Sequence, residues 1–259
     1  MKSMRFSGGR RGSRMGSEDR MLESKAARPL DLASNADGFS VVDAPDLRKV
    51  VQELVLEHLS DAAGKSLPTI GAAAAYLSGE GYPNFREKAA RMLPAYLFGA
   101  LQQALQEEGF LDPLAGEFVT GEEGRGEPDV YWRVVRPDSP SDVGSIHADK
   151  WFWDLLGFDF PADMQRVKVW LPLLQDDDNP SLMVLPGSHL RDFHYTSFVN
   201  HLGHRKPQYA DEDITDRLVP APVRTGQAVV FNDRLLHGGR STGVLRISLE
   251  FTLACRPRV

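Results

Sequence analysis

The chain of 259 residues contains one cysteine, Cys255, and no long apolar run. A single thiol cannot form an internal disulfide, and it excludes a cysteine-rich zinc site. Cysteine usage therefore predicts a protein of a reducing compartment, the cytoplasm. No apolar stretch approaches the roughly 18 residues that a membrane-spanning helix needs, so we expect no membrane partner.

The sequence also lacks the excess of basic residues that is typical of nucleic-acid-binding proteins, because its formal net charge is −6. Residues 1–28 nevertheless hold eight Lys/Arg against three Asp/Glu. They include no apolar stretch of about 7–15 residues, which a secretory signal requires. We predict a disordered basic tail over residues 1–37 and no nucleic-acid partner. The remaining part of the chain is acidic and offers no obvious basic patch, such as a coenzyme A thioester would need.

Helical patterns fill the first half of the chain and predict a helical part over residues 38–127. Apolar residues recur at helical spacing between Pro45 and Gly64, which suit the start and the end of a helix. A second helical block is expected over about 84–108, where Pro94 would divide or kink it.

Short β-rich segments replace the helices from residue 128 onward. They are residues 131–135, 167–171, 182–185, 228–231 and 244–254. Helices first and antiparallel strands later predict one domain over 38–259, mainly β with flanking α. Its core, residues 128–255, would be a double-stranded β-helix (a cupin-like jelly roll) with the N-terminal helices packed on one sheet. Residues 190–225 lack clear periodicity, as a lid-like insertion does.

The triplet His147-Ala148-Asp149 is a candidate metal site, and His237 lies ninety residues further on. In an extended strand, side chains at i and i+2 point to the same face, so His147 and Asp149 could bind one ion together. With His237 they would leave about three of six octahedral positions open, as in non-haem Fe(II) oxygenases. The competing interpretations are a chance triplet on a solvated segment and a histidine that caps a turn.

Four motifs follow one another along residues 128–252. They are His147-x-Asp149, Leu185-Pro186-Gly187-Ser188-His189, His237-Gly238-Gly239 and Arg246-x-Ser248. Their order resembles the phytanoyl-CoA dioxygenase-like family of Fe(II)/2-oxoglutarate-dependent oxygenases. The resemblance implies an enzyme in which His147, Asp149 and His237 hold catalytic Fe(II), with 2-oxoglutarate and O₂ as cosubstrates.

The reaction that the resemblance implies is hydroxylation of an unactivated C–H bond, with release of succinate and CO₂. The substrate would be a small molecule, such as a secondary metabolite, a lipid-like compound or a sugar derivative. Related halogenases have a small residue in place of the carboxylate, so Asp149 argues against halogenation. Desaturation, cyclisation and epimerisation stay open, as does a non-catalytic or cupin-like metal-binding barrel.

Candidate residues for 2-oxoglutarate lie on three β-rich segments. Alternation places Arg246 and Ser248 on one strand face, where a guanidinium and a hydroxyl could bind the distal carboxylate; the same face could equally lie in water. Arg240 is the rival anchor. Similar ectoine hydroxylase-type enzymes imply a cosubstrate role for Arg133. Lys168 and Trp170 could line the same pocket, or be a surface and a core residue, respectively.

The aromatic cluster Trp151-Phe152-Trp153 follows the triplet and is a candidate substrate wall. A segment packed onto the core is the competing interpretation for each of the three rings. His189 is interpreted as structural, because the proline and glycine before it predict a turn. Nothing in the sequence indicates an oligomeric state.

Overall fold

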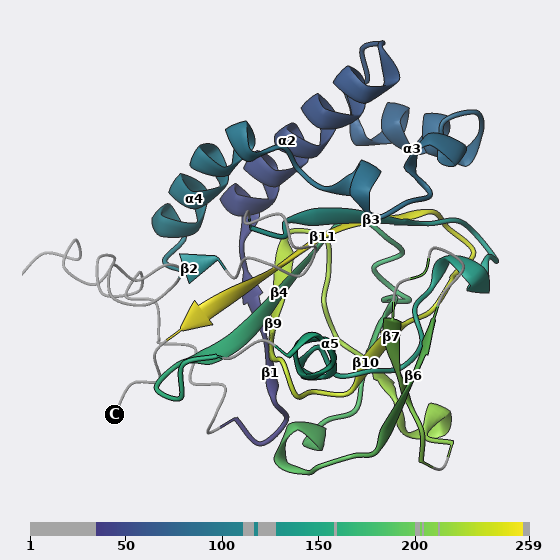
Figure 1. Cartoon of the computed structure of the whole chain (residues 1–259). Coiled ribbons are helices and arrows are strands. Elements are labelled where there is room, and N and C mark those ends of the chain that lie inside the picture. Colours follow the sequence, from purple (N-terminus) through teal and green to yellow (C-terminus); the bar gives the residue numbers. More distant parts are fainter. Residues whose placement is uncertain are drawn as a thin grey trace, which may run out of the picture.

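The computed structural model describes residues 35–110, 117–118, 128–157, 160–199, 203, 205–211 and 213–255. Nearly all of the predicted basic tail lies outside these residues. The described part is mainly β, with most of its α-helices gathered on one side of the strands (Figure 1).

Six strands form the main sheet, in the order β1-β9-β4-β11-β2, and β3 also pairs with β11. Their bounds are β1 (Phe39–Asp43), β2 (Glu117–Phe118), β3 (Tyr131–Val135), β4 (Gln165–Leu174), β9 (Gln227–Asn232) and β11 (Arg246–Cys255). All of their pairings are antiparallel. The five β-rich segments of the sequence are therefore strands, while β1 and β2 within the expected helical part were not predicted.

A smaller antiparallel sheet has the order β10-β5-β8. Its strands are β5 (Leu182–Val184), β8 (Val219–Pro220) and β10 (His237–Gly239). Together with the main sheet it forms the predicted double-stranded β-helix. The barrel mouth lies where β10 meets the segment before α5 (Lys150–Leu156).

The predicted lid-like insertion, 190–225, has regular structure in its described residues. A hairpin of β6 (Tyr195–Val199) and β7 (Arg205–Tyr209) forms its first half. A 3₁₀ turn over Thr215–Arg217 and strand β8 follow, and β8 pairs with β5 in the smaller sheet. The end of the segment is thus part of the barrel.

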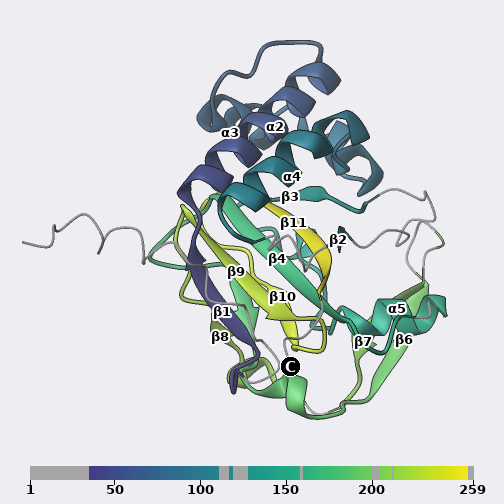
Figure 2. The ribbon, with the colours of Figure 1, turned by 90° about the vertical axis from the view of Figure 1, so that its left-hand side faces the viewer.

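The helices α2 (Pro45–Ala63), α3 (Ile70–Ser78) and α4 (Phe98–Glu107) lie along one side of the main sheet (Figures 1 and 2). As predicted, α2 starts at a proline, and Gly64 ends it with a left-handed φ of 62°. None of the helices described is long and apolar enough to cross a membrane.

The expected helical block over about 84–108 is divided at Pro94 as predicted, but its first part is not an α-helix. Short 3₁₀ segments occupy Tyr82–Phe85, Ala89–Arg91 and Ala95–Leu97 instead. Pro94 has an extended backbone (ψ 146°) and no N–H to donate, so an α-helix forms only from Phe98.

Each strand of the main sheet has two faces, and alternate residues divide between them. The helix-covered face packs against α2, α3 and α4 in one buried cluster that includes Trp132, Leu171, Leu249 and Phe251. Burying each such side chain contributes roughly 1.5–3 kcal/mol. This packing fixes which residues point the other way.

The opposite side of β3, β4 and β11, which we call the interior face, is lined by polar and aromatic side chains. They are Tyr131, Arg133, Lys168, Trp170, Arg246, Ser248, Glu250 and Thr252. The register places Glu250 beside both Tyr131 and Trp170. All but Arg133 are buried. The predicted alternation of Arg246 and Ser248 is confirmed, with their face buried and not in water.

Candidate metal centre

The two histidines of the candidate site face each other across an antiparallel bridge. The backbone N–H of His147 donates to the carbonyl of His237 at 3.0 Å, and the reverse bond measures 2.9 Å. Directly opposed residues in such a pair direct their side chains to the same side. The imidazole centroids therefore lie 4.5 Å apart although ninety residues separate them in sequence.

Backbone carbonyls orient both rings. Nδ1 of His147 lies 2.7 Å from the carbonyl oxygen of Ser145, and Nδ1 of His237 lies 3.0 Å from that of Leu235. A carbonyl only accepts, so each Nδ1 carries a proton, and in a neutral ring Nε2 then presents its lone pair. Burial, and then the neighbouring His147, lower the pKa of His237 to about 4, which keeps that ring neutral at pH 7. Neutral, oriented imidazoles are the form that binds metals.

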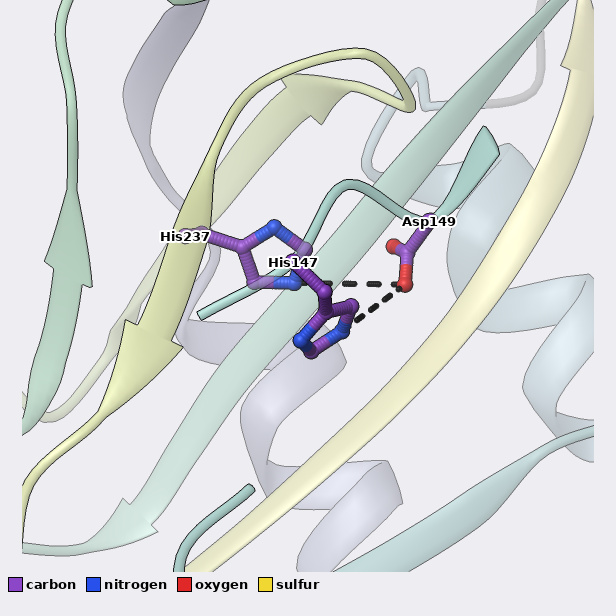
Figure 3. A group of neighbouring side chains, drawn as sticks. All are labelled: His147, Asp149 and His237. Carbon is purple, nitrogen blue, oxygen red and sulfur yellow. Dashed lines mark ion pairs between the residues drawn. The ribbon is translucent and has the colours of Figure 1, made fainter. Parts of the chain in front are cut away.

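Asp149 completes the cluster from the N-terminal end of α5, and not from a strand. Its backbone is helical (φ −60°, ψ −34°), and His147 forms only an isolated bridge. The predicted extended geometry of the triplet is therefore wrong, although its two side chains converge. Oδ1 of Asp149 lies 3.5 Å from Nε2 of His147 and 3.9 Å from Nε2 of His237 (Figure 3).

The carboxylate of Asp149 is buried and ionised. Burial alone would raise its pKa, but Lys168, whose Nζ lies 3.8 Å from Oδ2, and the two imidazoles hold the pKa well below its usual range. Oδ2 has no hydrogen-bond partner among the described residues. A charged oxygen in this position favours a bound cation.

The geometry of the cluster fits a metal ion. One ligand atom from each of His147, Asp149 and His237 lies within 4.8 Å of the others. Ligand atoms about 2.1 Å from one ion at right angles lie roughly 3 Å apart, close to the spacings observed. Two imidazoles and one carboxylate suit a non-haem iron site with open positions.

Arg246 and Ser248 lie on the interior face close to this cluster. A small cavity of about 30 Å³ is lined by His147, His237, Trp170 and Arg246 among others. Nη1 of Arg246 donates to Ser181 at 3.1 Å, while Nε of Arg246 and Oγ of Ser248 are buried without a hydrogen-bond partner in the described part. Burial, followed by the nearby Arg133, lowers the pKa of Arg246 to about 10. These are groups that a carboxylate would satisfy.

The rival arginine lies elsewhere. Nε of Arg240 donates to the carbonyl of Pro180 at 3.1 Å, and its Nη2 bonds to Asn179. Arg240 is not among the residues that line the small cavity. The geometry thus favours Arg246 as a carboxylate partner.

Arg133 is held in place by Glu250 and Tyr131. Its Nε forms an ion pair with Glu250, and its Nη2 donates to the hydroxyl of Tyr131 at 3.1 Å. Burial opposes ionisation of Glu250, but Arg133 and Lys168 lower its pKa to about 2. Alternation of β11 had placed Glu250 on this face, yet the sequence gave no sign of its pairing with Arg133.

The three aromatic residues after the triplet separate in space. The ring of Phe152 contacts His147 edge-on, with centroids 5.2 Å apart. Trp151 stacks on Tyr195 at 4.9 Å, and Trp153 is buried with Arg166 over its ring. Because α5 is helical, consecutive side chains point in different directions, and Phe152 alone of the three contacts a ring of the candidate metal site.

His189 lies outside the candidate metal site. It is buried against Gly38 and takes no part in the cluster.

Gly239 on β10 lies close to Arg246. A Cβ at Gly239 would lie 2.7 Å from Cγ1 of Val143 and 3.3 Å from Nη1 of Arg246. Glycine at this position therefore lets β10 approach Arg246.

A larger cavity of about 660 Å³ adjoins the small one, and we call it the basic cavity. Six basic side chains line it: Arg86, Lys88, Arg91, Arg133, Arg136 and Lys206. The expectation that the folded part offers no basic patch is therefore wrong. Three of them, Arg86, Lys88 and Arg91, are close in sequence, but the other three come from distant segments, so no local run of charge predicts the full set.

Residues 100–246 match the family model described as phytanoyl-CoA dioxygenase (PhyH). Among solved structures, the chain is similar to EvdO2 from Micromonospora carbonacea var. aurantiaca complexed with 2-oxoglutarate. The two are 16% identical, with a TM-score of 0.51 over 90% of this chain and 93% of that one. This likeness shows a shared fold. No curated protein sequence matches the chain.

Two further structures have the same general likeness. EctD from S. alaskensis, with 2-oxoglutarate and 5-hydroxyectoine, is 16% identical, with a TM-score of 0.48 over 87% of this chain and 75% of that one. AviO1 from Streptomyces viridochromogenes Tue57 is 15% identical, with a TM-score of 0.46 over 88% and 94%.

Proposed function

Because the chain belongs to the phytanoyl-CoA dioxygenase family and is an Fe(II)- and 2-oxoglutarate-dependent oxygenase, we propose that it hydroxylates an unactivated C–H bond of a small molecule. Succinate and CO₂ would be released with the product. The observation that carries the proposal is the convergence of His147, Asp149 and His237. Arg246, whose Nε has no partner among the described residues, lines the same small cavity as the two histidines.

His147, Asp149 and His237 would hold the iron. When bound, iron would activate O₂, which is the oxidant, and 2-oxoglutarate would supply two of the electrons that reduce it, leaving as succinate and CO₂. The backbone carbonyls of Ser145 and Leu235 keep both Nε2 lone pairs directed at the ion. Lys168 keeps Asp149 ionised without occupying a hydrogen-bonding position on Oδ2.

Arg246 would bind the distal carboxylate of 2-oxoglutarate, and Ser248 would add a hydrogen bond. A guanidinium matches a carboxylate with two parallel N–H···O bonds. Nη1 of Arg246 donates to Ser181, but the buried Nε has no hydrogen-bond partner among the described residues, so this donor is available to a carboxylate. The guanidinium of Arg246 is buried and has lost its contact with water, which costs free energy. An anionic partner would offset that cost.

The carboxylate of Asp149 supports hydroxylation over halogenation, because it takes a coordination position that a halide would need. Arg133 would stand at the outer end of the cosubstrate, fixed by Glu250 and Tyr131. Burial of Glu250 and Tyr131 lowers the local dielectric constant, which strengthens the charge interactions of these groups.

Succinate release across a metabolite panel tests this proposal. The full chain is incubated with Fe(II), 2-oxoglutarate, O₂ and each candidate metabolite, and the molecular mass of each product is measured by mass spectrometry. We expect a compound that stimulates succinate release and gains one oxygen atom. A product that loses two hydrogens without gaining oxygen would replace hydroxylation by desaturation or cyclisation.

A further inference from the structure

We propose that the substrate carries an anionic group, a phosphate or a carboxylate, and that the basic cavity binds this group while the remainder reaches the metal centre. The inference rests on the proposed function, because it assigns a substrate class to the same site. It goes beyond the family match, which names no substrate for this chain.

The walls of the basic cavity come from separate parts of the fold. The segment Tyr82–Arg91 forms one wall, β3 a second, residues 141–144 a third, and Lys206 on β7 contributes from the hairpin. Its volume of about 660 Å³ falls within the roughly 300–1,000 Å³ that small-molecule sites have.

The charge of the cavity is opposite to that of the whole chain. Two carboxylates, Glu87 and Asp142, line it beside the six basic side chains. Asp142 is already neutralised: Arg136 donates to both of its oxygens at 2.8 and 3.0 Å, and the hydroxyl of Tyr82 donates at 2.6 Å. The surplus is therefore positive although the chain carries −6, and such a pocket concentrates anions.

Two guanidiniums crowd the inner wall. Nε of Arg91 donates to the backbone carbonyl of Glu87 at 3.3 Å, a neutral acceptor that leaves the charge in place. Burial, and then the proximity of Arg133, lower the pKa of Arg91 to about 10. Glu250 already pairs with Arg133, so Arg91 is the guanidinium of this wall that an added anion would neutralise.

The basic cavity leads to the metal centre through shared residues. Arg133, Val143 and Gly144 line both this cavity and the small one beside His147 and His237. Nζ of Lys206 lies 5.4 Å from the centroid of the Phe152 ring, which itself contacts His147. An anion held by the arginines would thus direct its apolar part along Phe152 toward the ligand cluster.

Calorimetric titration with matched probes tests the inference. Phenyl phosphate, benzoate, phenol and benzamide are titrated separately into the full chain with Fe(II) and saturating 2-oxoglutarate, without oxygen. Saturating 2-oxoglutarate blocks binding of the probes at Arg246. We expect at least one anionic probe to bind ten-fold or more tightly than its neutral partner. The phosphate and carboxylate arms distinguish the two kinds of anion.

Charge-removing variants locate the binding. Arg91→Gln should weaken the anionic probe at least five-fold and leave the neutral probe unchanged. Arg86→Gln changes an exposed residue of the cavity and should also weaken binding of the anionic probe. It provides the test if Arg91→Gln does not fold. Lys49→Gln removes the same charge from the exposed side of α2 and should have no effect.

Equal binding of charged and neutral probes would overturn the inference, as would equal weakening by Lys49→Gln and the cavity variants. The same samples are also measured by visible absorption, since Fe(II) and 2-oxoglutarate bound together should give a weak charge-transfer band. If that band forms and the anionic probes fail to bind, the inference fails and the proposed function stands. If the probes bind and the band is absent, the proposed function fails alone.

Discussion

The two faces of the main sheet have the same strands and the same alternation, but opposite chemistry. On the helix-covered face, Trp132, Leu249 and Phe251 pack against α2 and α4 with essentially no exposed surface. On the interior face, the residues between them are Arg133, Ser248 and Glu250. One face stabilises the fold, and the other presents buried charges whose partners decide what the protein binds.

The difference explains how the fold tolerates buried charges on the interior face. Buried charges that lack complete hydrogen bonding are costly, and only a strong apolar core tolerates them. The central position of β11, paired with β4 on one side and with β3 and β2 on the other, holds both faces rigid. Substitutions on the two faces should therefore separate stability from cosubstrate binding.

The largest expected effect on stability comes from Phe251→Ala on the helix-covered face. Truncating a fully buried phenylalanine costs about 3–5 kcal/mol through lost contacts and a residual cavity. Ser248→Ala, three residues earlier on the same strand but on the interior face, removes a hydroxyl that has no partner among the described residues. It should lower the free energy of unfolding by less than about 1 kcal/mol. Urea denaturation of the metal-free protein measures both. Equal losses would remove the distinction between the faces.

Cosubstrate affinity should respond in the opposite way. Arg246→Ala should raise the apparent KM for 2-oxoglutarate by about 30-fold or more, since losing one partner of a buried charge pair costs at least about 2 kcal/mol. Arg240→Ala removes an arginine bonded to Asn179 and Pro180 and should change KM less than about three-fold. Steady-state succinate release measures both. A larger effect at Arg240 would transfer the carboxylate site to that residue.

A smaller, pH-dependent effect is expected at Glu250, where the interior face holds its own ion pair. Its pKa is lowered to about 2, so the stability that its ionised form provides is fully present above its ordinary pKa of 4.5 and declines as the pH falls toward 2. Glu250→Gln should therefore be less stable than the parent at pH 7, with the gap narrowing below pH 4.5. Urea midpoints at pH 7 and pH 3.5 measure it. A gap independent of pH would indicate lost packing and no ion pair.

Much of this comparison could be predicted from the sequence. β-Rich composition identified β3, β4, β5, β9 and β11, and alternation along β11 separates Arg246 and Ser248 from Leu249. Two histidines and one aspartate were identified as candidate ligands from residue type, order and family resemblance. Local sequence was sufficient here because strand periodicity is a short-range property.

The failures have physical causes of their own. The division of the second helical block at Pro94 was predicted, but the 3₁₀ segments before it were not. Helix α3 was missed because its alanine-rich sequence has no apolar stripe. The triplet was expected in a strand, whereas Asp149 starts α5. The basic cavity has Arg91, Arg133 and Lys206 in one lining, and no local pattern brings these three segments together.

The most direct test of the central claim is an anaerobic visible-absorption titration of the full chain with Fe(II) and 2-oxoglutarate. The wild-type protein should develop a weak visible charge-transfer band. His147→Ala should not, and His194→Ala, at an exposed position outside the cluster, should retain it. Absence of the band in the wild type, or an unchanged band in His147→Ala, would contradict the assignment of His147, Asp149 and His237 as the iron site.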